Sequence, residues 1–149
     1  MHRLIFYIFL TLVFLTACSQ STAPENYNTA QCVYVYDGDT YQCILDSDTI
    51  VVRHLYIDCY EIHRGSRLEK QAERNHISVD SALSLGLQAK EYVKKLIQGK
   101  NIKLIRINGE DNMDVYGRYL RLVVYQGNRL DSLLLNTGLA FEYKPFILQ

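Results

Sequence analysis

The chain has 149 residues, with 16 basic and 16 acidic side chains and a formal net charge of zero. This balance excludes a protein that binds polyanions through overall positive charge, so any such contact has to come from a local patch. The length suits a single domain with one hydrophobic core.

The N-terminus has the pattern of an export signal. A short basic start precedes an apolar run of 13 residues, at positions 4–16. Such a run is too short to cross a bilayer comfortably and is typical of a signal peptide. It closes on the letters LTAC, which resemble the bacterial lipobox and end at Cys18. We predict a lipoprotein signal over residues 1–17 and an exported cell-envelope protein whose lipid anchor on Cys18 holds it to a membrane. An ordinary secretory signal with a chance cysteine is the alternative.

A tether and one domain are expected after the signal. Residues 18–29 are rich in serine, threonine and asparagine, which predicts a flexible tether. The folded domain is expected to cover residues 30–149. Removal of residues 1–17 takes away one charged residue, Arg3, and leaves 15 basic and 16 acidic residues, a net charge of −1. Non-specific affinity for nucleic acid should therefore be modest.

Cysteine pairing has two interpretations. The chain has four cysteines, and lipidation of Cys18 would leave an odd number, Cys32, Cys43 and Cys59. Cys32 and Cys43 flank a predicted hairpin turn, so in an exported protein they are the best-placed disulfide pair. Three small buried thiols explain the pattern equally well.

The first half of the domain is predicted to be a three-stranded meander. Runs rich in β-branched and aromatic residues alternate with turn residues such as Asp37-Gly38. The predicted strands cover 33–36, 40–45 and 49–57. Residues 58–80 are charged and lack a strong period, which predicts an exposed loop with at most a helical turn near 68–74.

The second half mixes helices and strands. Apolar residues at helical spacing predict a helix over 81–97. Its apolar stripe is Leu83, Leu87, Ala89, Tyr92, Val93, Leu96 and Ile97. Strands at 101–107 and 118–125, a short helix at 130–136 and an extended piece at 139–143 follow.

These elements predict a mainly β fold with helices. Five strands with a helix between the third and the fourth, and a short helix after the fifth, match the OB-fold, a small Greek-key barrel. This fold also hosts plain binding modules, so it does not decide the function.

Charged residues at the predicted strand ends indicate chemistry. Arg53 interrupts an apolar strand, where an unpaired charge facing the core would be unfavourable. Asp39, Asp58 and Glu61 supply carboxylates that can hold a hard cation or accept a proton from water. Arginines such as Arg53 and Arg118 can grip a phosphate with two hydrogen bonds. Each residue alone also fits a turn or a solvent-facing position, but the combination predicts phosphodiester hydrolysis.

Several strings resemble the staphylococcal nuclease (thermonuclease) family. The resemblance covers residues 31–145. The shared strings are Asp37-Gly38-Asp39-Thr40, then Arg53 followed by Asp58 and Glu61, then Tyr116-Gly117-Arg118, then Tyr143-Lys144-Pro145.

The resemblance implies a metal site and a general base. One Ca²⁺ would be held by the carboxylates of Asp39 and Asp58 and by the backbone carbonyl of Cys59. Glu61 would be the base that activates the attacking water.

The resemblance also implies how the substrate is held. Arg53 and Arg118 would clamp the phosphate, and Tyr116 and Tyr143 match aromatic positions that contact the terminal nucleotide. Ordinary packing at the barrel rim is the alternative for both tyrosines. The implied protein is a monomeric, Ca²⁺-dependent endonuclease that cleaves DNA and RNA with little sequence preference and leaves 3′-phosphates.

The chain departs from the family pattern at several positions. Cys59-Tyr60 stands where the family usually has Thr-Pro, so Glu61 follows a loop without a rigid proline. Val115 replaces a lysine and Phe141 replaces a tyrosine. The alternative function is a non-catalytic OB-fold lipoprotein that binds nucleic acid or a partner. Members that have lost catalysis typically lose the acidic and arginine positions, all of which are present here.

Overall fold

The computed structural model describes residues 26–143. The predicted signal peptide, Cys18 and most of the predicted tether lie outside the described residues, as do Lys144 and Pro145. None of the helices within residues 26–143 has the length and apolar character of a membrane span.

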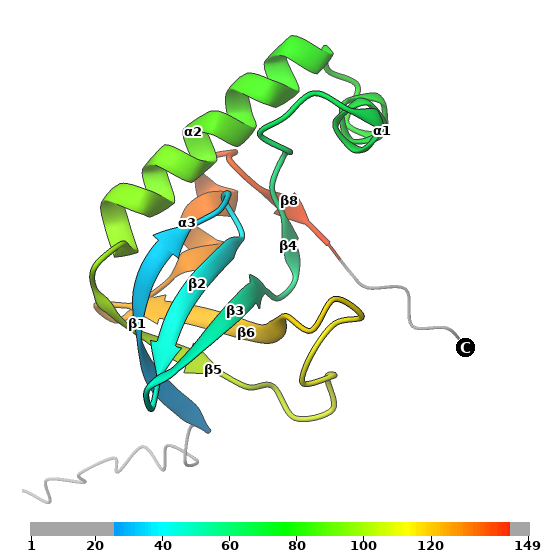
Figure 1. The fold of residues 1–149 in the computed structure, drawn as a ribbon. Coiled ribbons are helices and arrows are strands. Elements are labelled where there is room, and N and C mark those ends of the chain that lie inside the picture. Colours follow the sequence, from blue (N-terminus) through cyan, green and yellow to red (C-terminus); the bar gives the residue numbers. More distant parts are fainter. Residues whose placement is uncertain (1–25, 144–149) are drawn as a thin grey trace, which may run out of the picture.

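Five strands close into a barrel, as expected for an OB-fold (Figure 1). They are β1 (Tyr27–Val35), β2 (Thr40–Leu45), β3 (Asp48–His54), β5 (Asn101–Ile105) and β6 (Tyr119–Tyr125). The strand order is β3-β2-β1-β5-β6, and β3 also pairs in parallel with β6, which closes the barrel. β7 (Asn128–Arg129) extends this sheet beyond β6. β4 (Ile57–Asp58) pairs separately with β8 (Phe141–Glu142).

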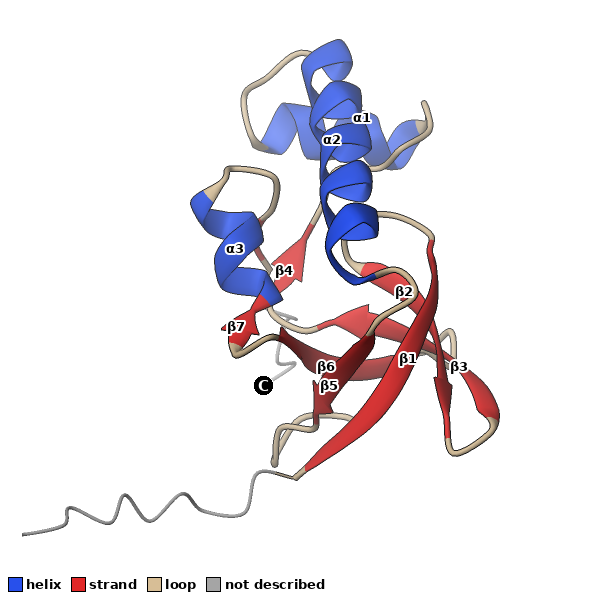
Figure 2. Ribbon diagram, turned by 90° about the vertical axis from the view of Figure 1, so that its left-hand side faces the viewer, coloured by secondary structure: helices blue, strands red, loops and turns tan. Residues whose placement is uncertain are grey.

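Three helices complete the domain: α1 (Ser66–Arg74), α2 (Val79–Ile97) and α3 (Leu130–Asn136). α2 begins after Ser78, whose hydroxyl accepts a hydrogen bond from the Ser81 N–H, and Lys94 and Lys95 lie in its last turn. Both features stabilise helix ends. Figure 2 shows that α1 and α2 lie at the same end of the barrel.

Two differences between the predicted and the observed strands bear on the site. β1 begins at Tyr27 and pairs with β5 from Tyr27 opposite Ile105, so the last residues of the predicted tether belong to the barrel. The strand predicted over 49–57 is interrupted after His54, because Tyr56 adopts a positive φ of 66° before β4 starts. This interruption turns Ile57 and Asp58 out of the barrel sheet and pairs them with β8.

The prediction of a loop over 58–80 was wrong for its central part. Residues there form a nine-residue helix, α1, of which only Leu68, Gln71 and Ala72 are buried. Two apolar residues in a charged stretch are a weak periodic signal, so the helix was underestimated.

The buried face of α2 also differs from the predicted stripe. Leu87 is 46% exposed, whereas Ala82 and Gly86 are buried. A Cβ atom at Gly86 would lie 2.5 Å from the carbonyl oxygen of Tyr60, so α2 packs directly on a backbone that only small residues can approach.

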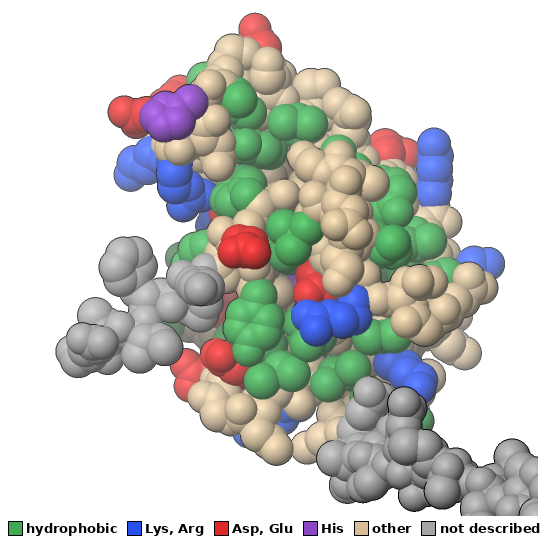
Figure 3. All heavy atoms as spheres, turned by 180° about the vertical axis from the view of Figure 1, so that it is seen from behind, with side chains coloured by type: hydrophobic (Ala, Val, Ile, Leu, Met, Phe, Trp, Pro, Cys, Tyr) green, Lys and Arg blue, Asp and Glu red, His purple; other side chains and the backbone are tan. Residues whose placement is uncertain are grey.

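The hydrophobic core has two parts. The barrel core includes Tyr41, Val52, Ile57 and Leu104, which are fully buried. A second cluster between α1 and α2 consists of Tyr60, Leu68, Ala72 and Ala82. Seen from behind, the surface mixes acidic and basic side chains, and both kinds lie at the end that carries α1 (Figure 3).

The cysteines of the barrel are free thiols in the structure. Cys32 and Cys43 lie directly opposite each other on β1 and β2, and Cys59 is also buried. Of the two interpretations of the cysteines, the structure thus has the one with three buried thiols, and Cys32 and Cys43 lie at neighbouring positions.

Candidate active site

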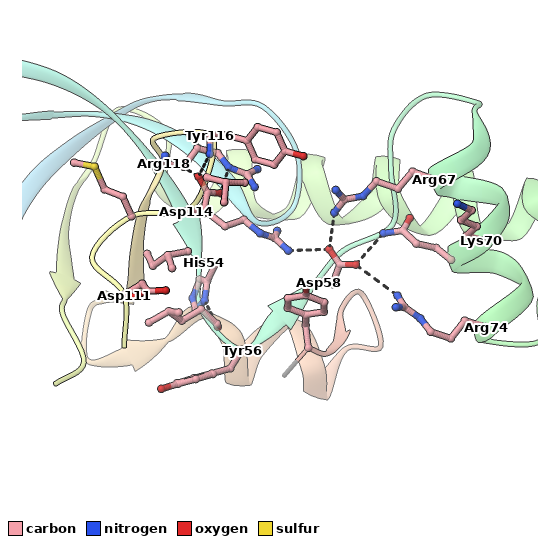
Figure 4. A pocket seen from close by; sticks show the side chains of 17 residues that line it. His54, Tyr56, Asp58, Arg67, Lys70, Arg74, Asp111, Asp114, Tyr116 and Arg118 are labelled. Carbon is pink, nitrogen blue, oxygen red and sulfur yellow. Dashed lines mark hydrogen bonds and ion pairs between the residues drawn. The ribbon is translucent and has the colours of Figure 1, made fainter. Parts of the chain in front are cut away.

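A pocket of about 610 Å³ opens between α1, the end of β3 and the loop before β6 (Figure 4). Of the predicted site residues, five line it: Arg53, Asp58, Tyr116, Arg118 and Tyr143. The structure therefore brings together residues from distant parts of the chain. The other predicted site residues of the described chain lie next to this pocket rather than on its wall.

A buried arginine joins two buried carboxylates at the base of the pocket. Arg53 is 7% exposed, and Asp39 and Asp58 are each 4% exposed. One terminal nitrogen of the Arg53 guanidinium pairs with Asp39, and the other lies 2.8 Å from Asp58 Oδ1. Buried charges persist only when they are paired in this way. The arginine that interrupts an apolar strand is thus satisfied inside the fold.

Strand pairing explains how Asp39 reaches Arg53. Thr40 at the start of β2 lies opposite Arg53 on β3, so the preceding Asp39 is placed beside the guanidinium. The Asp39 N–H donates to Asp37 Oδ1 at 3.1 Å, which fixes the turn. Gly38 does not have a positive φ, so backbone conformation does not require a glycine there. The close approach of Cys59 does, because a Cβ atom at position 38 would lie 2.6 Å from Cys59 Sγ.

The loop from Asp58 to Glu61 is held from several sides. The Cys59 N–H donates to Asp39 Oδ2 at 2.6 Å. Gln71 on α1, 3% exposed, donates from Nε2 to Asp58 Oδ2 at 3.0 Å and to the Cys59 carbonyl at 2.9 Å. Its Oε1 accepts the Glu61 N–H at 2.9 Å. The loop therefore has a well-defined position although it lacks a proline.

Tyr60 anchors the same loop by packing. Its side chain is 6% exposed and lies in the cluster between α1 and α2. Its ring packs against Phe141, with ring centroids 5.1 Å apart, and the Arg74 guanidinium lies 4.9 Å from the centre of the Phe141 ring. A proline would restrict this loop through its ring. Here the buried Tyr60 side chain holds the loop in place by packing instead.

Glu61 lies beside the pocket and not on its wall. Its side chain is 32% exposed, and its Oε1 is 2.6 Å from Nε of Arg67 on α1. Arg67 also approaches Asp58 Oδ1, at 3.3 Å. A carboxylate that acts as a proton acceptor must have a free oxygen, and the contact with Arg67 is made by Oε1 of Glu61.

Arg118 lines the side of the pocket that faces α1, apart from the cluster of Asp39, Arg53 and Asp58. Its Nε lies 2.6 Å from Asp114 Oδ2, and the backbone N–H groups of Tyr116 and Arg118 both donate to Asp114 Oδ1 at 2.9 Å. Partial burial would raise the pKa of Asp114, but these hydrogen bonds and the Arg118 charge outweigh it and lower that pKa. Asp114 therefore stays charged and keeps Arg118 oriented.

Two exposed tyrosines border the pocket. Tyr116 is 79% exposed, and the Arg118 guanidinium lies 5.4 Å from the centre of its ring. Tyr143 is 43% exposed, and its N–H donates to the Tyr56 carbonyl at 2.8 Å. Neither ring is buried in the barrel rim, and exposed tyrosines of this kind can stack on a nucleobase.

His54 lies at the pocket and is neutral. It is 2% exposed, and burial lowers its pKa to about 4. Nδ1 lies 2.9 Å from the Leu55 carbonyl, so this nitrogen carries the proton, while Nε2 has no hydrogen-bond partner among residues 26–143. A buried neutral ring with one unsatisfied nitrogen serves packing here.

The predicted Ca²⁺ ligands fit a hard cation in their chemistry. Among residues 26–143, no group of three or more histidine, cysteine, aspartate or glutamate side chains could hold a metal ion. The predicted set has two such side chains, Asp39 and Asp58, and adds the Cys59 carbonyl. In the structure, Asp58 Oδ2 and the Cys59 carbonyl oxygen both accept hydrogen bonds from Gln71 Nε2, at 3.0 and 2.9 Å. Oxygen donors of this kind suit Ca²⁺.

Sequence reasoning missed six charged or amide residues of the site. They are Arg67, Lys70, Gln71 and Arg74 on α1, and Asp111 and Asp114 in the loop before β6. Spacings of three or four residues from 67 to 74 are a helical signal that could have placed the first four on one face. An aspartate four residues before Arg118 was a second available signal.

Comparisons with known proteins identify the family of the chain. The model of the family described as staphylococcal nuclease homologue matches residues 51–148, which include Arg53, Asp58 and Arg118 but begin after Asp39. The chain is also 28% identical over 148 residues to a Haemophilus influenzae protein named as an uncharacterized endonuclease. That alignment covers 97% of this chain and 67% of the relative.

Proposed function

The chain belongs to the family of staphylococcal nuclease homologues, and from this premise we propose that it is a Ca²⁺-dependent nuclease that cleaves DNA and RNA with little sequence preference. The observation that carries the proposal is the cluster of Asp39, Arg53 and Asp58 beneath a pocket that Arg118 also lines. This arrangement combines fixed positive charge with oxygen donors for a cation, which phosphodiester hydrolysis needs.

The two arginines would hold the phosphate. Arg53 is fixed by buried partners, and Arg118 is oriented by Asp114 across the same pocket. Charge builds up on the phosphate oxygens in the transition state, so guanidiniums fixed in advance stabilise that state more than the ground state. A Ca²⁺ ion held by Asp39, Asp58 and the Cys59 carbonyl would neutralise part of the same charge.

Glu61 would accept the proton of the attacking water. In the structure its carboxylate is paired with Arg67. A bound phosphate offers Arg67 an alternative anionic partner, which would also release Oε1 of Glu61. Tyr116 and Tyr143 would stack on or hydrogen-bond to the nucleotide, and the products would carry 3′-phosphates.

A metal panel tests the proposed function. The purified full chain is incubated with labelled single-stranded DNA and RNA in Ca²⁺, Mg²⁺ or Mn²⁺, and the products are separated by length. We expect cleavage with Ca²⁺ and none after a chelator is added. If no metal supports cleavage, the nuclease proposal fails and a non-catalytic binding module takes its place.

We also propose that the protein is a monomer in the cell envelope, tethered through a lipid on Cys18. The support is the apolar run that closes on LTAC, which lies outside the described residues. Cells that express the chain should incorporate labelled palmitate into it, and Cys18→Ala should abolish the label. Equal labelling of both proteins would contradict the anchor.

A further inference from the structure

Helix α1 presents two different faces. Its buried residues, Leu68, Gln71 and Ala72, dock it onto the domain. Its basic residues, Arg67, Lys70 and Arg74, are exposed and line the pocket. Glu69 and Glu73 are also exposed but do not line the pocket. Spacings of three and four residues place the basic residues on one side of a helix. This side of α1 is named the basic face below.

Helix α1, which carries the basic face, is held firmly against the rest of the domain. Gln71 bonds α1 to the Asp58–Glu61 loop through both ends of its amide. Leu68 is fully buried in the cluster between α1 and α2. Charges on a docked helix lose less freedom when they bind a ligand than charges on a mobile loop do.

The basic face lies across the pocket from Arg118. In Figure 4, Arg67, Lys70 and Arg74 lie on one side of Asp58, and Arg118 and Tyr116 lie on the other. If a phosphate of a nucleic-acid strand is held by Arg53 and Arg118, the strand would therefore continue past α1 in one direction.

The basic face has more positive charge than its partners neutralise. The Asp58 carboxylate already pairs with Arg53 at 2.8 Å, and Arg67 and Arg74 approach it at 3.3 and 3.6 Å. Among the described residues, Lys70 has no carboxylate partner. Arg67 and Arg74 keep side-chain exposures of 58% and 54%, so their guanidiniums are open to further anions.

We propose that the basic face of α1 binds backbone phosphates of single-stranded nucleic acid next to the phosphate that is cleaved. This inference rests on the proposed nuclease function and assigns a substrate-binding role to Arg67, Lys70 and Arg74. At Arg67 a bound phosphate would compete with the Oε1 atom of Glu61.

The test measures binding separately from cleavage. Binding of a short fluorescein-labelled oligothymidylate to the full chain is followed by anisotropy in chelator, at several salt concentrations. The double variant Lys70→Ala with Arg74→Ala is compared with Lys94→Ala with Lys95→Ala. The control pair is exposed in the last turn of α2 and does not line the pocket.

We expect the α1 variant to bind about tenfold more weakly, because it lacks charge-assisted hydrogen bonds to the phosphates. The slope of log affinity against log salt should become less steep by about 0.7 for each phosphate that the variant no longer neutralises. The control pair should keep the affinity and the slope of the parent. Because Arg74 also packs on Phe141, the single variant Lys70→Glu is measured as well, and it should weaken binding in the same direction.

Two outcomes separate this inference from the proposed function. If the parent binds and cleaves but the α1 variants bind equally well, the basic face is not a substrate site, and the nuclease proposal stands. If the parent neither binds nor cleaves, the proposed function fails and the inference about α1 fails with it.

Discussion

The two walls of the pocket are built in different ways. On the barrel wall, the Arg53 side chain is 9% exposed and pairs with two buried carboxylates. On the α1 wall, Arg67 and Arg74 are more than half exposed and reach the same Asp58 from solvent. Buried pairs are fixed and depend strongly on each partner, whereas exposed pairs contribute little to stability. The difference indicates that the barrel wall holds the chemistry in place and the α1 wall remains free to meet a substrate.

Removal of Arg53 should have the largest effect. Arg53→Ala leaves Asp39 and Asp58 buried without their shared partner, so we expect the free energy of unfolding to fall by about 3–5 kcal/mol. Urea unfolding followed by far-UV circular dichroism measures it. Arg74→Ala on the α1 wall is the matched control and should stay within about 1 kcal/mol of the parent. Equal losses in the two variants would show that the walls do not differ.

Arg118 and Glu61 should affect turnover far more than stability. Arg118→Ala and Glu61→Gln are each expected to lower the rate of DNA cleavage at least about a hundredfold, because each removes a group that acts in the transition state. Both groups are partly exposed, so the free energy of unfolding should change by less than about 1 kcal/mol. Initial rates and urea unfolding are measured on the same preparations. Activity retained by either variant would mean that its assigned role is wrong.

Gln71 connects the two walls, and its loss should affect both properties. Gln71→Met keeps a similar volume but removes the bonds to Asp58, Cys59 and Glu61. We expect the free energy of unfolding to fall by about 2 kcal/mol. Turnover should fall about tenfold, because small displacements of a catalytic group slow the reaction.

Gln88→Met is the control for this change, since Gln88 is exposed on α2 and bonds only to Ser84. It should alter the free energy of unfolding by less than about 0.5 kcal/mol. If Gln71→Met lowers stability but leaves turnover unchanged, Gln71 supports the fold and does not position Glu61.

His54 should make the barrel wall sensitive to acid. Burial lowers its folded-state pKa to about 4, below the ordinary value of 6.5. Between these values the unfolded chain binds a proton that the folded chain does not, so stability falls as the pH falls through this window. From pH 7 to pH 5 the loss should be about 2 kcal/mol. Ring titration by NMR gives the pKa directly, and an unshifted value for His54 would refute the assignment.

Local patterns predicted the barrel. Alternating strands, the Asp37-Gly38 turn and the helical spacing in α2 depend on neighbouring residues, and each appears in the fold. The combination of charged residues suggested a joint site, and two of its members, Arg53 and Asp58, do lie 2.8 Å apart, because β3 and β4 are separated by a short stretch of chain.

Contacts between distant elements were not predictable in the same way. Gln71 resembles any polar residue of a charged helix, and its burial depends on backbone groups of the Asp58–Glu61 loop. Leu87 fits the apolar stripe of α2 by spacing, but the close approach of that loop favours Gly86 at the interface. The pairing of Glu61 with Arg67 likewise follows from how α1 docks, which no local period reveals.

The rate of DNA cleavage as a function of Ca²⁺ concentration tests the central claim most directly. The parent chain should show a rate that rises with Ca²⁺, saturates, and falls to background when a chelator is added. Asp58→Asn, purified in parallel, should need more Ca²⁺ to reach half of its maximal rate, because it lacks one carboxylate ligand. Two results would contradict a metal-dependent site built on Asp39, Arg53 and Asp58. One is cleavage that continues at the same rate after the chelator is added, and the other is a Ca²⁺ requirement that is unchanged in Asp58→Asn.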